Sequence, residues 1–189
     1  MKKICVVTGT KEEYTFLYKV LENFNKDFNI DLKLIVTGKH LSPDFGLTYK
    51  EIEKDFKIDK KIEMYPKLMT NVSISNSLGL SIIGFANAFE ELKPDFILVC
   101  SNSYTTYGVC IVSVIANIPI LNIFSNNLID KEIPKSILDS IVKMSEMNLV
   151  VNTQEKNILE AYYNKSLNIE IFEEFNKINS TFLNNVRGN

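Results

Sequence analysis

The sequence predicts an α/β fold, with a doubly wound, mostly parallel Rossmann-like sheet and helices on both of its faces. Short, fully apolar runs alternate with helical patterns along the chain, and the first run ends at a glycine turn that opens a helix. No repeat, low-complexity segment or linker interrupts this alternation. Strands that are apolar throughout are typical of parallel sheets covered by helices. We therefore expect about six strands in one domain, wound like a nucleotide-binding fold.

The first strand and turn set the pattern for the rest of the chain. Residues 4–7 are apolar, Thr8-Gly9-Thr10 forms a turn, and residues 11–14 open a helix. In open α/β sheets such a turn carries backbone N–H groups and a helix N-terminus, and nucleotides and phosphates bind there. Because the turn has one glycine and no GxGxxG motif, it is equally consistent with an ordinary strand–helix connection.

The later elements follow from the same patterns. Further strands are expected at 32–36, 61–65, 96–100, 118–124 and 149–151. Helices are expected at 14–24, 48–55, 71–92, 107–116, 133–144, 153–163 and, with no strand signal, 169–186. Small residues near the start of 71–92 should allow another element to approach closely. We expect a domain over 1–165 and a C-terminal helical tail over 166–189.

Composition excludes several classes of partner. The chain has 189 residues and a net charge of −2, so electrostatics give no reason to expect nucleic acid or an anionic membrane as partner. The longest apolar stretch, 78–89, contains glycine, serine and asparagine and is expected to be too short to span a bilayer. Arg187 is the single arginine, so a bidentate arginine clamp on phosphate is not expected.

The cysteines and the N-terminus indicate a cytoplasmic protein. Cys5, Cys100 and Cys110 lie in apolar runs and show no pairing pattern, which is typical of reduced core thiols. A nucleophilic cysteine is the alternative, but the single histidine, His40, is a poor candidate partner. The charged start leads into only a short apolar run, so no secretory signal is expected.

Several stretches together resemble the UDP-N-acetylglucosamine 2-epimerase family, in particular its hydrolysing branch, which supplies sugars of the sialic-acid type. They are VVTGTKEEY (6–14), VTGKHLSPDFGLTYKEIEKD (36–55), SLGLSIIGFANAFEELKPDFILV (77–99), IANIPI (115–120), SIVKMS (140–145) and NTQEKNILE (152–160). The resemblance covers most of 1–165, and its second stretch is long and specific.

The resemblance implies one half of a glycosyltransferase-B-like architecture, with the UDP-sugar held between two Rossmann-like domains. It also implies anti elimination of UDP followed by addition of water, with inversion at C2 and with carboxylates as acid and base. No cofactor and no metal site are expected. The chain ends near where the family begins its second domain, so candidate partners are a UDP-sugar, a separate second-domain chain and a second copy of this chain.

The sequence departs from the family at the residues that the resemblance assigns to catalysis. After the strand at 96–100 the family has Gly-Asp-Arg-Tyr-Glu, whereas this chain has Asn102, Ser103 and Thr105 in place of the aspartate, arginine and glutamate. Asn127 replaces a glutamate, and Lys11 replaces an arginine. An amide is not a base at neutral pH. We therefore predict no catalytic residue, because the family positions at Asn102 and Asn127 lack carboxylates.

The resemblance leaves a set of predicted substrate-binding residues, Lys11, Glu12, Thr15, His40 and Ser103. Each has an alternative role: Glu12 and the adjacent Glu13 could cap a helix, and His40 could be a surface loop histidine. Tyr104 and Tyr107 are expected to pack, and Asn122, Asn126 and Asn127 could either bond a sugar or fill a loop.

Two functions remain open. The chain could be an epimerase, completed by a partner chain, or a non-catalytic module that retains nucleotide-sugar binding. The apolar surplus on 71–92 and 107–116 further predicts self-association or an exposed apolar patch.

Overall fold

A seven-stranded sheet forms the centre of the protein. The computed structural model describes residues 1–64, 69–100, 102–125, 128, 133–163, 167–172 and 178–186. The strands are β1 (Lys2–Thr8), β2 (Ile30–Thr37), β3 (Lys60–Ile62), β4 (Phe96–Cys100), β5 (Ile120–Phe124), β6 (Met147–Val150) and β7 (Ile169–Ile171). Their order is β3-β2-β1-β4-β5-β6-β7 and every pair is parallel, which confirms the predicted fold class.

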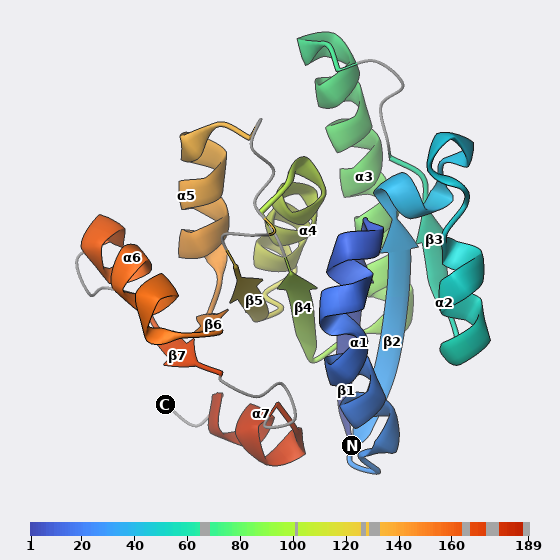
Figure 1. Cartoon of the computed structure of the whole chain (residues 1–189). Helices are drawn as coiled ribbons and strands as arrows, with labels where there is room; N and C mark the ends of the chain where they lie inside the picture. The colour runs from blue at the N-terminus through green and yellow to red at the C-terminus, as the bar shows by residue number, and fades with distance from the viewer. Residues whose placement is uncertain are drawn as a thin grey trace.

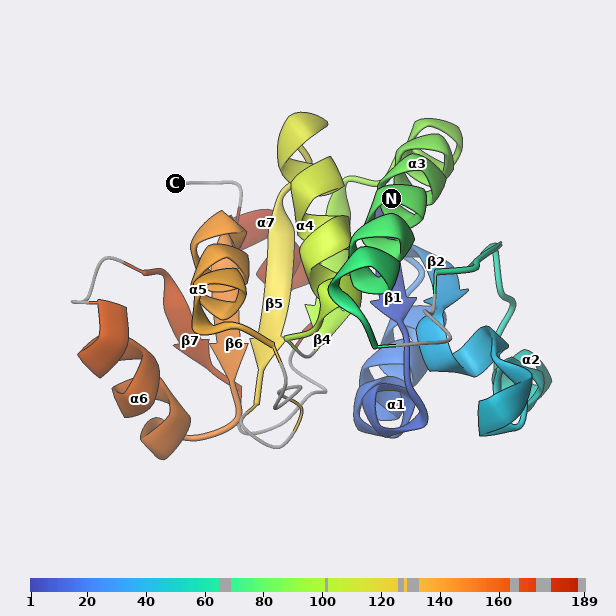
Figure 2. The ribbon, with the colours of Figure 1, turned by 90° about the horizontal axis from the view of Figure 1, so that it is seen from above.

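Helices cover both faces of the sheet. They are α1 (Lys11–Lys26), α2 (Tyr49–Asp55), α3 (Asn71–Leu92), α4 (Tyr104–Ile115), α5 (Lys135–Met144), α6 (Thr153–Tyr163) and α7 (Ser180–Val186), with 3₁₀ turns at Gly38–Leu41 and Pro43–Phe45. Figures 1 and 2 show α1 on one face and α3, α4 and α5 on the other. α7 packs into the same apolar cluster as α1.

The alternation of side chains along β1 builds two core layers. Ile4 and Val6 pack with α1, whereas Cys5 and Val7 pack with α3 and α4. Every residue of β4 and β5 is buried, as expected for central parallel strands. The three cysteines are free and buried, as predicted.

The C-terminal region differs from the helix expected over 169–186. Residues 169–171 form the short edge strand β7, which pairs with β6, and the next helix in the described residues is Ser180–Val186. Three residues give too little periodicity to distinguish a strand from a helical turn. The weak strand expected at 61–65 is found at Lys60–Ile62, and Tyr65 lies outside the described residues.

α3 and α4 approach closely, as the small residues of α3 predicted. A Cβ atom added at Gly108 would lie 2.5 Å from the Ser81 hydroxyl oxygen, so a larger residue there would force the Ser81 side chain to move. By length and composition α3 is also long enough to cross a membrane, which corrects the expectation drawn from 78–89. This is weak evidence, because core helices of soluble proteins meet the same test; in this protein α3 packs on β3 and α4.

Candidate functional site

The carboxyl edge of the sheet carries the candidate site. The strand order reverses between β1 and β4, and ligands of open α/β sheets bind at such a switch point. Gly38 has a φ of 59°, and a Cβ added there would lie 2.9 Å from the Gly9 carbonyl oxygen. A Cβ added at Gly9 would lie 3.5 Å from Thr105 Oγ1. The turns after β1, β2 and β4 therefore meet at one edge, as predicted; Ser101 and Asn126 lie outside the described residues.

The turn between β1 and α1 is closed by the protein's own carboxylate. The Thr10 hydroxyl oxygen accepts a hydrogen bond from the Glu13 N–H at 3.2 Å, and Glu13 Oε2 accepts one from the Gly9 N–H at 2.6 Å. Glu13 is buried. This is a variant of the capping box, in which the carboxylate accepts from the N–H of the residue before the N-cap and not from the N-cap itself. The geometry supports the ordinary capped connection, because the Gly9 N–H that would hold a phosphate is already bonded.

His40 is completely buried, so its interpretation as a surface loop histidine is wrong. Its Nε2 lies 3.1 Å from the Thr8 hydroxyl, its Nδ1 lies 2.7 Å from the Thr48 hydroxyl, and its backbone N–H donates to the Gly9 carbonyl at 3.3 Å. Burial lowers the pKa of His40 to about 4, so the ring is neutral at pH 7. His40 ties the end of β1 to the start of α2.

Three of the predicted substrate-binding residues lie on the outside of the first turns of α1. Lys11 and Glu12 are exposed, and Lys11 Nζ forms an ion pair with Glu51 Oε2 at 2.9 Å. Thr15 is also exposed, and its hydroxyl donates to the Lys11 carbonyl at 2.8 Å. The structure therefore does not bring these residues together with buried His40 in one pocket, and their role in binding stays a prediction.

The turn between β4 and α4 is the other half of the switch point. Ser103 is the N-cap of α4, and its hydroxyl oxygen accepts a hydrogen bond from the Thr106 N–H at 3.2 Å. This cap starts the helix at Tyr104, earlier than the expected residue 107. Asn102 precedes the cap and is completely buried, and among the described residues neither its Nδ2 nor its Oδ1 has a hydrogen-bond partner.

Beside this turn, β5 and β6 share a buried polar network. Asn122 Nδ2 donates to Asn148 Oδ1 at 3.1 Å, and Asn148 Nδ2 donates to the Val142 carbonyl at 3.0 Å. Asn122 is thus part of a strand and not of a loop. Asn126 and Asn127, the other two asparagines of that prediction, lie outside the described residues.

Glu155 was not among the residues predicted from the sequence. Its Oε1 accepts from the Ser125 hydroxyl at 3.2 Å and its Oε2 accepts from the Val151 N–H at 3.3 Å, which ties the end of β5 to α6. Asn152 accepts from the Glu155 N–H at 2.9 Å, so Asn-x-x-Glu repeats the Thr-x-x-Glu pattern at the start of α1. In the described part of the chain no three His, Cys, Asp or Glu side chains gather as metal ligands would.

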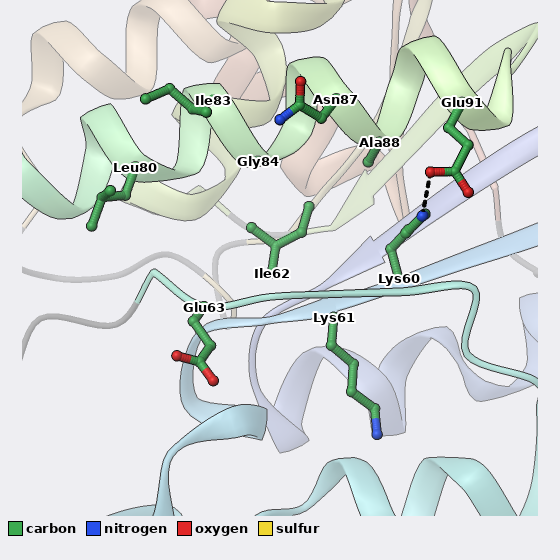
Figure 3. Close-up of a pocket in the computed structure, with 10 residues that line it drawn as sticks. All are labelled: Lys60, Lys61, Ile62, Glu63, Leu80, Ile83, Gly84, Asn87, Ala88 and Glu91. Carbon is green, nitrogen blue, oxygen red and sulfur yellow. Dashed lines mark hydrogen bonds and ion pairs between the residues drawn. The ribbon is translucent and has the colours of Figure 1, made fainter.

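A groove of about 390 Å³ lies between β3 and α3 (Figure 3). Leu80 and Ile83 border it and are each more than half exposed, at 62% and 61%, so the predicted exposed apolar patch is present. A Lys60–Glu91 ion pair spans one end. None of the predicted substrate-binding residues lines this groove.

Comparison with known proteins agrees with this architecture. The family model described as "UDP-N-acetylglucosamine 2-epimerase" matches residues 21–172. The GDP/UDP-N,N'-diacetylbacillosamine 2-epimerase (hydrolyzing) of Campylobacter jejuni is 40% identical over 152 residues, covering 79% of this chain and 39% of the relative. The corresponding UDP-N,N'-diacetylbacillosamine 2-epimerase of Legionella pneumophila is 28% identical over 160 residues, covering 84% and 42%. The chain thus spans about 40% of the length of these curated relatives.

Solved structures show the same fold. The UDP-GlcNAc 2-epimerase of Neisseria meningitidis bound to UDP-GlcNAc superposes with a TM-score of 0.72 at 19% identity, covering 89% of this chain and 45% of that one. Acinetobacter baumannii MurG superposes with a TM-score of 0.55 at 10% identity, covering 80% and 42%. At these identities the likeness concerns the fold alone, whereas the family model matches most of the chain. The chain belongs to the UDP-N-acetylglucosamine 2-epimerase family, of which it represents the N-terminal half.

Proposed function

We propose that this chain binds a nucleotide-linked, N-acetylated amino sugar at the carboxyl edge of its sheet, and that it does not epimerise or hydrolyse that sugar alone. The relatives' names give the substrate class, since they refer to UDP- and GDP-linked diacetamido sugars and to UDP-GlcNAc. The free, buried cysteines support a cytoplasmic location.

The proposal rests mainly on which carboxylates lie at the switch point and on how they are hydrogen-bonded. Removing a proton from C2 requires a positioned base. Glu13, the buried carboxylate in the described part of this turn, is bonded to the Gly9 N–H, and His40 is held by two hydroxyl groups. Asn102 stands where the family has an aspartate, and its amide cannot accept the proton.

A split enzyme is the second candidate, because the chain spans about 40% of its curated relatives. In that case a separate chain would supply the second wall of the cleft, which excludes water and holds the nucleotide. The triple variant Asn102→Asp, Ser103→Arg and Asn127→Glu discriminates between the two candidates. Turnover by the unchanged chain with a second half in trans supports the split enzyme, whereas turnover that requires both the variant and the second half supports the binding module.

Binding is tested by titrating the ¹⁵N-labelled chain with UDP-GlcNAc. We expect weak affinity, on the order of 1 mM, because one wall buries only part of the ligand. Amide resonances of Gly9, Asn102 and Ser103 should shift, while those of Leu80 and Ile83 in the β3–α3 groove serve as an internal control. Shifts confined to the groove, or no shift at millimolar ligand, would overturn the proposal.

A further inference from the structure

The first turn of α1 holds a buried carboxylate that belongs to the protein itself. Glu13 lies three residues after the N-cap Thr10 and is only 5% exposed. Its Oε2 accepts a hydrogen bond of 2.6 Å from the N–H of Gly9, the residue before the cap. The positive end of the helix dipole favours an anion at this position. Glu13 therefore occupies the place after β1 where an open α/β sheet would bind the phosphate of a ligand.

The start of α6 repeats this arrangement elsewhere along the same edge. The side-chain oxygen of Asn152 accepts from the Glu155 N–H at 2.9 Å, and Glu155 is 6% exposed. Glu155 Oε2 accepts from the N–H of Val151, the residue before Asn152, at 3.3 Å, and its Oε1 accepts from the Ser125 hydroxyl. Because β4 and β5 lie between β1 and β6, the two turns are separate cases of one device. In each, a buried glutamate bonds the N–H of the residue before the cap.

The charges around the α1 turn also disfavour a ligand anion. Lys11 supplies a positive charge there, but its Nζ is held by Glu51 Oε2 at 2.9 Å. Glu12 adds an exposed carboxylate beside buried Glu13. His40 is neutral at pH 7, so Lys11 stands against three carboxylates, those of Glu12, Glu13 and Glu51. A phosphate would have to displace Glu13 and to approach this turn against net negative charge.

We propose that Glu13 and Glu155 are specificity-determining residues, each an internal anion that closes the start of its helix to the phosphate of a ligand. Ligands that bind through phosphate at the first turn of a parallel sheet, as dinucleotides do, are thereby excluded. The Gly9 shift expected with UDP-GlcNAc must then come from a part of that ligand other than its phosphates. The inference goes beyond the proposed function, because it concerns anions as a class and holds whether or not a nucleotide sugar binds.

The test compares Glu13→Ala with a matched control, Glu12→Ala, by titrating the ¹⁵N-labelled chains with inorganic phosphate at constant ionic strength. Both variants remove one negative charge from the same turn, but Glu13→Ala also leaves the Gly9 N–H without its acceptor. Glu13→Ala should bind phosphate on the order of tenfold more tightly than the unchanged chain, and the Gly9 amide resonance should shift. Glu12→Ala should change the phosphate affinity by less than about twofold, because salt screens an exposed charge.

Thermal stability gives a second readout of the same variants. Glu13→Ala should lower the melting temperature by several degrees, because a buried N–H loses its partner. Phosphate should restore part of this loss by binding the folded form, and should raise the melting temperature more than it does in the unchanged chain. Glu155→Ala should behave in the same way, with the Val151 amide as its reporter.

Two results with the variants would overturn the inference. An unchanged phosphate affinity in Glu13→Ala and Glu155→Ala would mean that the glutamates do not keep phosphate out. An equal gain in Glu12→Ala would mean that charge alone, and not the occupied N–H, excludes the anion.

A third measurement uses the unchanged chain and so does not depend on the folding of a variant. The amide resonances of Gly9 and Val151 should stay in place when millimolar inorganic phosphate is added. A shift of either resonance that saturates with phosphate would contradict the inference and would leave the binding of UDP-GlcNAc a separate question.

Discussion

Protonation of His40 should destabilise the fold, and because the chain has a single histidine the effect can be isolated. The ring is fully buried between the hydroxyl groups of Thr8 and Thr48. In the unfolded chain its pKa is about 6.5, and burial lowers it to about 4 in the folded protein. The folded state therefore favours the neutral ring. The stability that depends on the neutral ring is fully present above pH 6.5 and is lost as the pH falls towards 4.

The size of the effect follows from the two pKa values. A difference of about 2.5 pH units corresponds to at most about 3 kcal/mol, lost at up to about 1.4 kcal/mol per pH unit. Between pH 6.5 and about 5 most carboxylates remain ionised, so the loss in this window comes mainly from His40. Protonation should also loosen the link between the end of β1 and the start of α2.

The assay is urea unfolding at a series of pH values, with His40→Asn as the control that keeps a short polar side chain but does not titrate. The variant should be less stable than the unchanged chain at pH 7. Its free energy of unfolding should change little between pH 6.5 and about 5, the window in which the unchanged chain loses stability. A histidine pKa near 6.5 in the NMR titration of the folded protein, or equal slopes for the two chains, would refute this account of His40.

Three further predictions concern the core, the turns and the surface. The three cysteine thiols, whose pKa is raised by burial, should not react with a thiol reagent in native buffer but should all react in denaturant; rapid labelling of the folded chain would disprove their burial. Gly38→Ala should lower the free energy of unfolding more than Gly46→Ala does. At Gly38 the φ is positive and the added Cβ would lie 2.9 Å from the Gly9 carbonyl oxygen, whereas at Gly46 nothing lies within 4 Å and the positive φ alone costs about 1 kcal/mol. Equal costs would mean that the close approach is relieved. Light scattering should show that the chain self-associates, and the double variant Leu80→Glu with Ile83→Glu should abolish this association. The control Phe28→Glu changes a residue that is 97% exposed elsewhere on the surface and should leave the association intact. A strict monomer at high concentration would contradict the prediction.

The sequence predicted the elements with strong periodicity and missed those with little. The expected bounds of α3 agree with the structure because Thr70 caps its start and Lys93, in the left-handed region before Pro94, ends it. β7 was missed because three residues on a sheet edge carry almost no pattern. The parallel sheet followed from the apolar strands, since burial on both faces leaves no alternation.

The site was harder to predict than the fold because hydrogen-bond partners come from distant parts of the chain. His40 was placed correctly at the carboxyl edge, yet its burial depends on Thr8 and Thr48, and the sequence alone could not pair them. Glu13 was recognised as a capping residue but not as the group that occupies the Gly9 N–H. That the Asn102 amide has no hydrogen-bond partner among the described residues is a property of packing, which the sequence does not show.

The central claim is that this chain holds a nucleotide sugar without a base to activate it, and turnover in deuterated water tests that claim most directly. The purified chain is incubated with UDP-GlcNAc, and UDP release and deuterium at C2 are followed by NMR, with a heat-killed sample and a full-length relative as controls. Loss of a general base typically costs about 10²–10⁴-fold in rate, so we predict neither UDP release nor deuterium at C2 above the heat-killed control. Release of UDP, or deuterium at C2, by the unchanged chain alone would show that the edge around Asn102 and Glu13 is a rebuilt active site and would contradict the account.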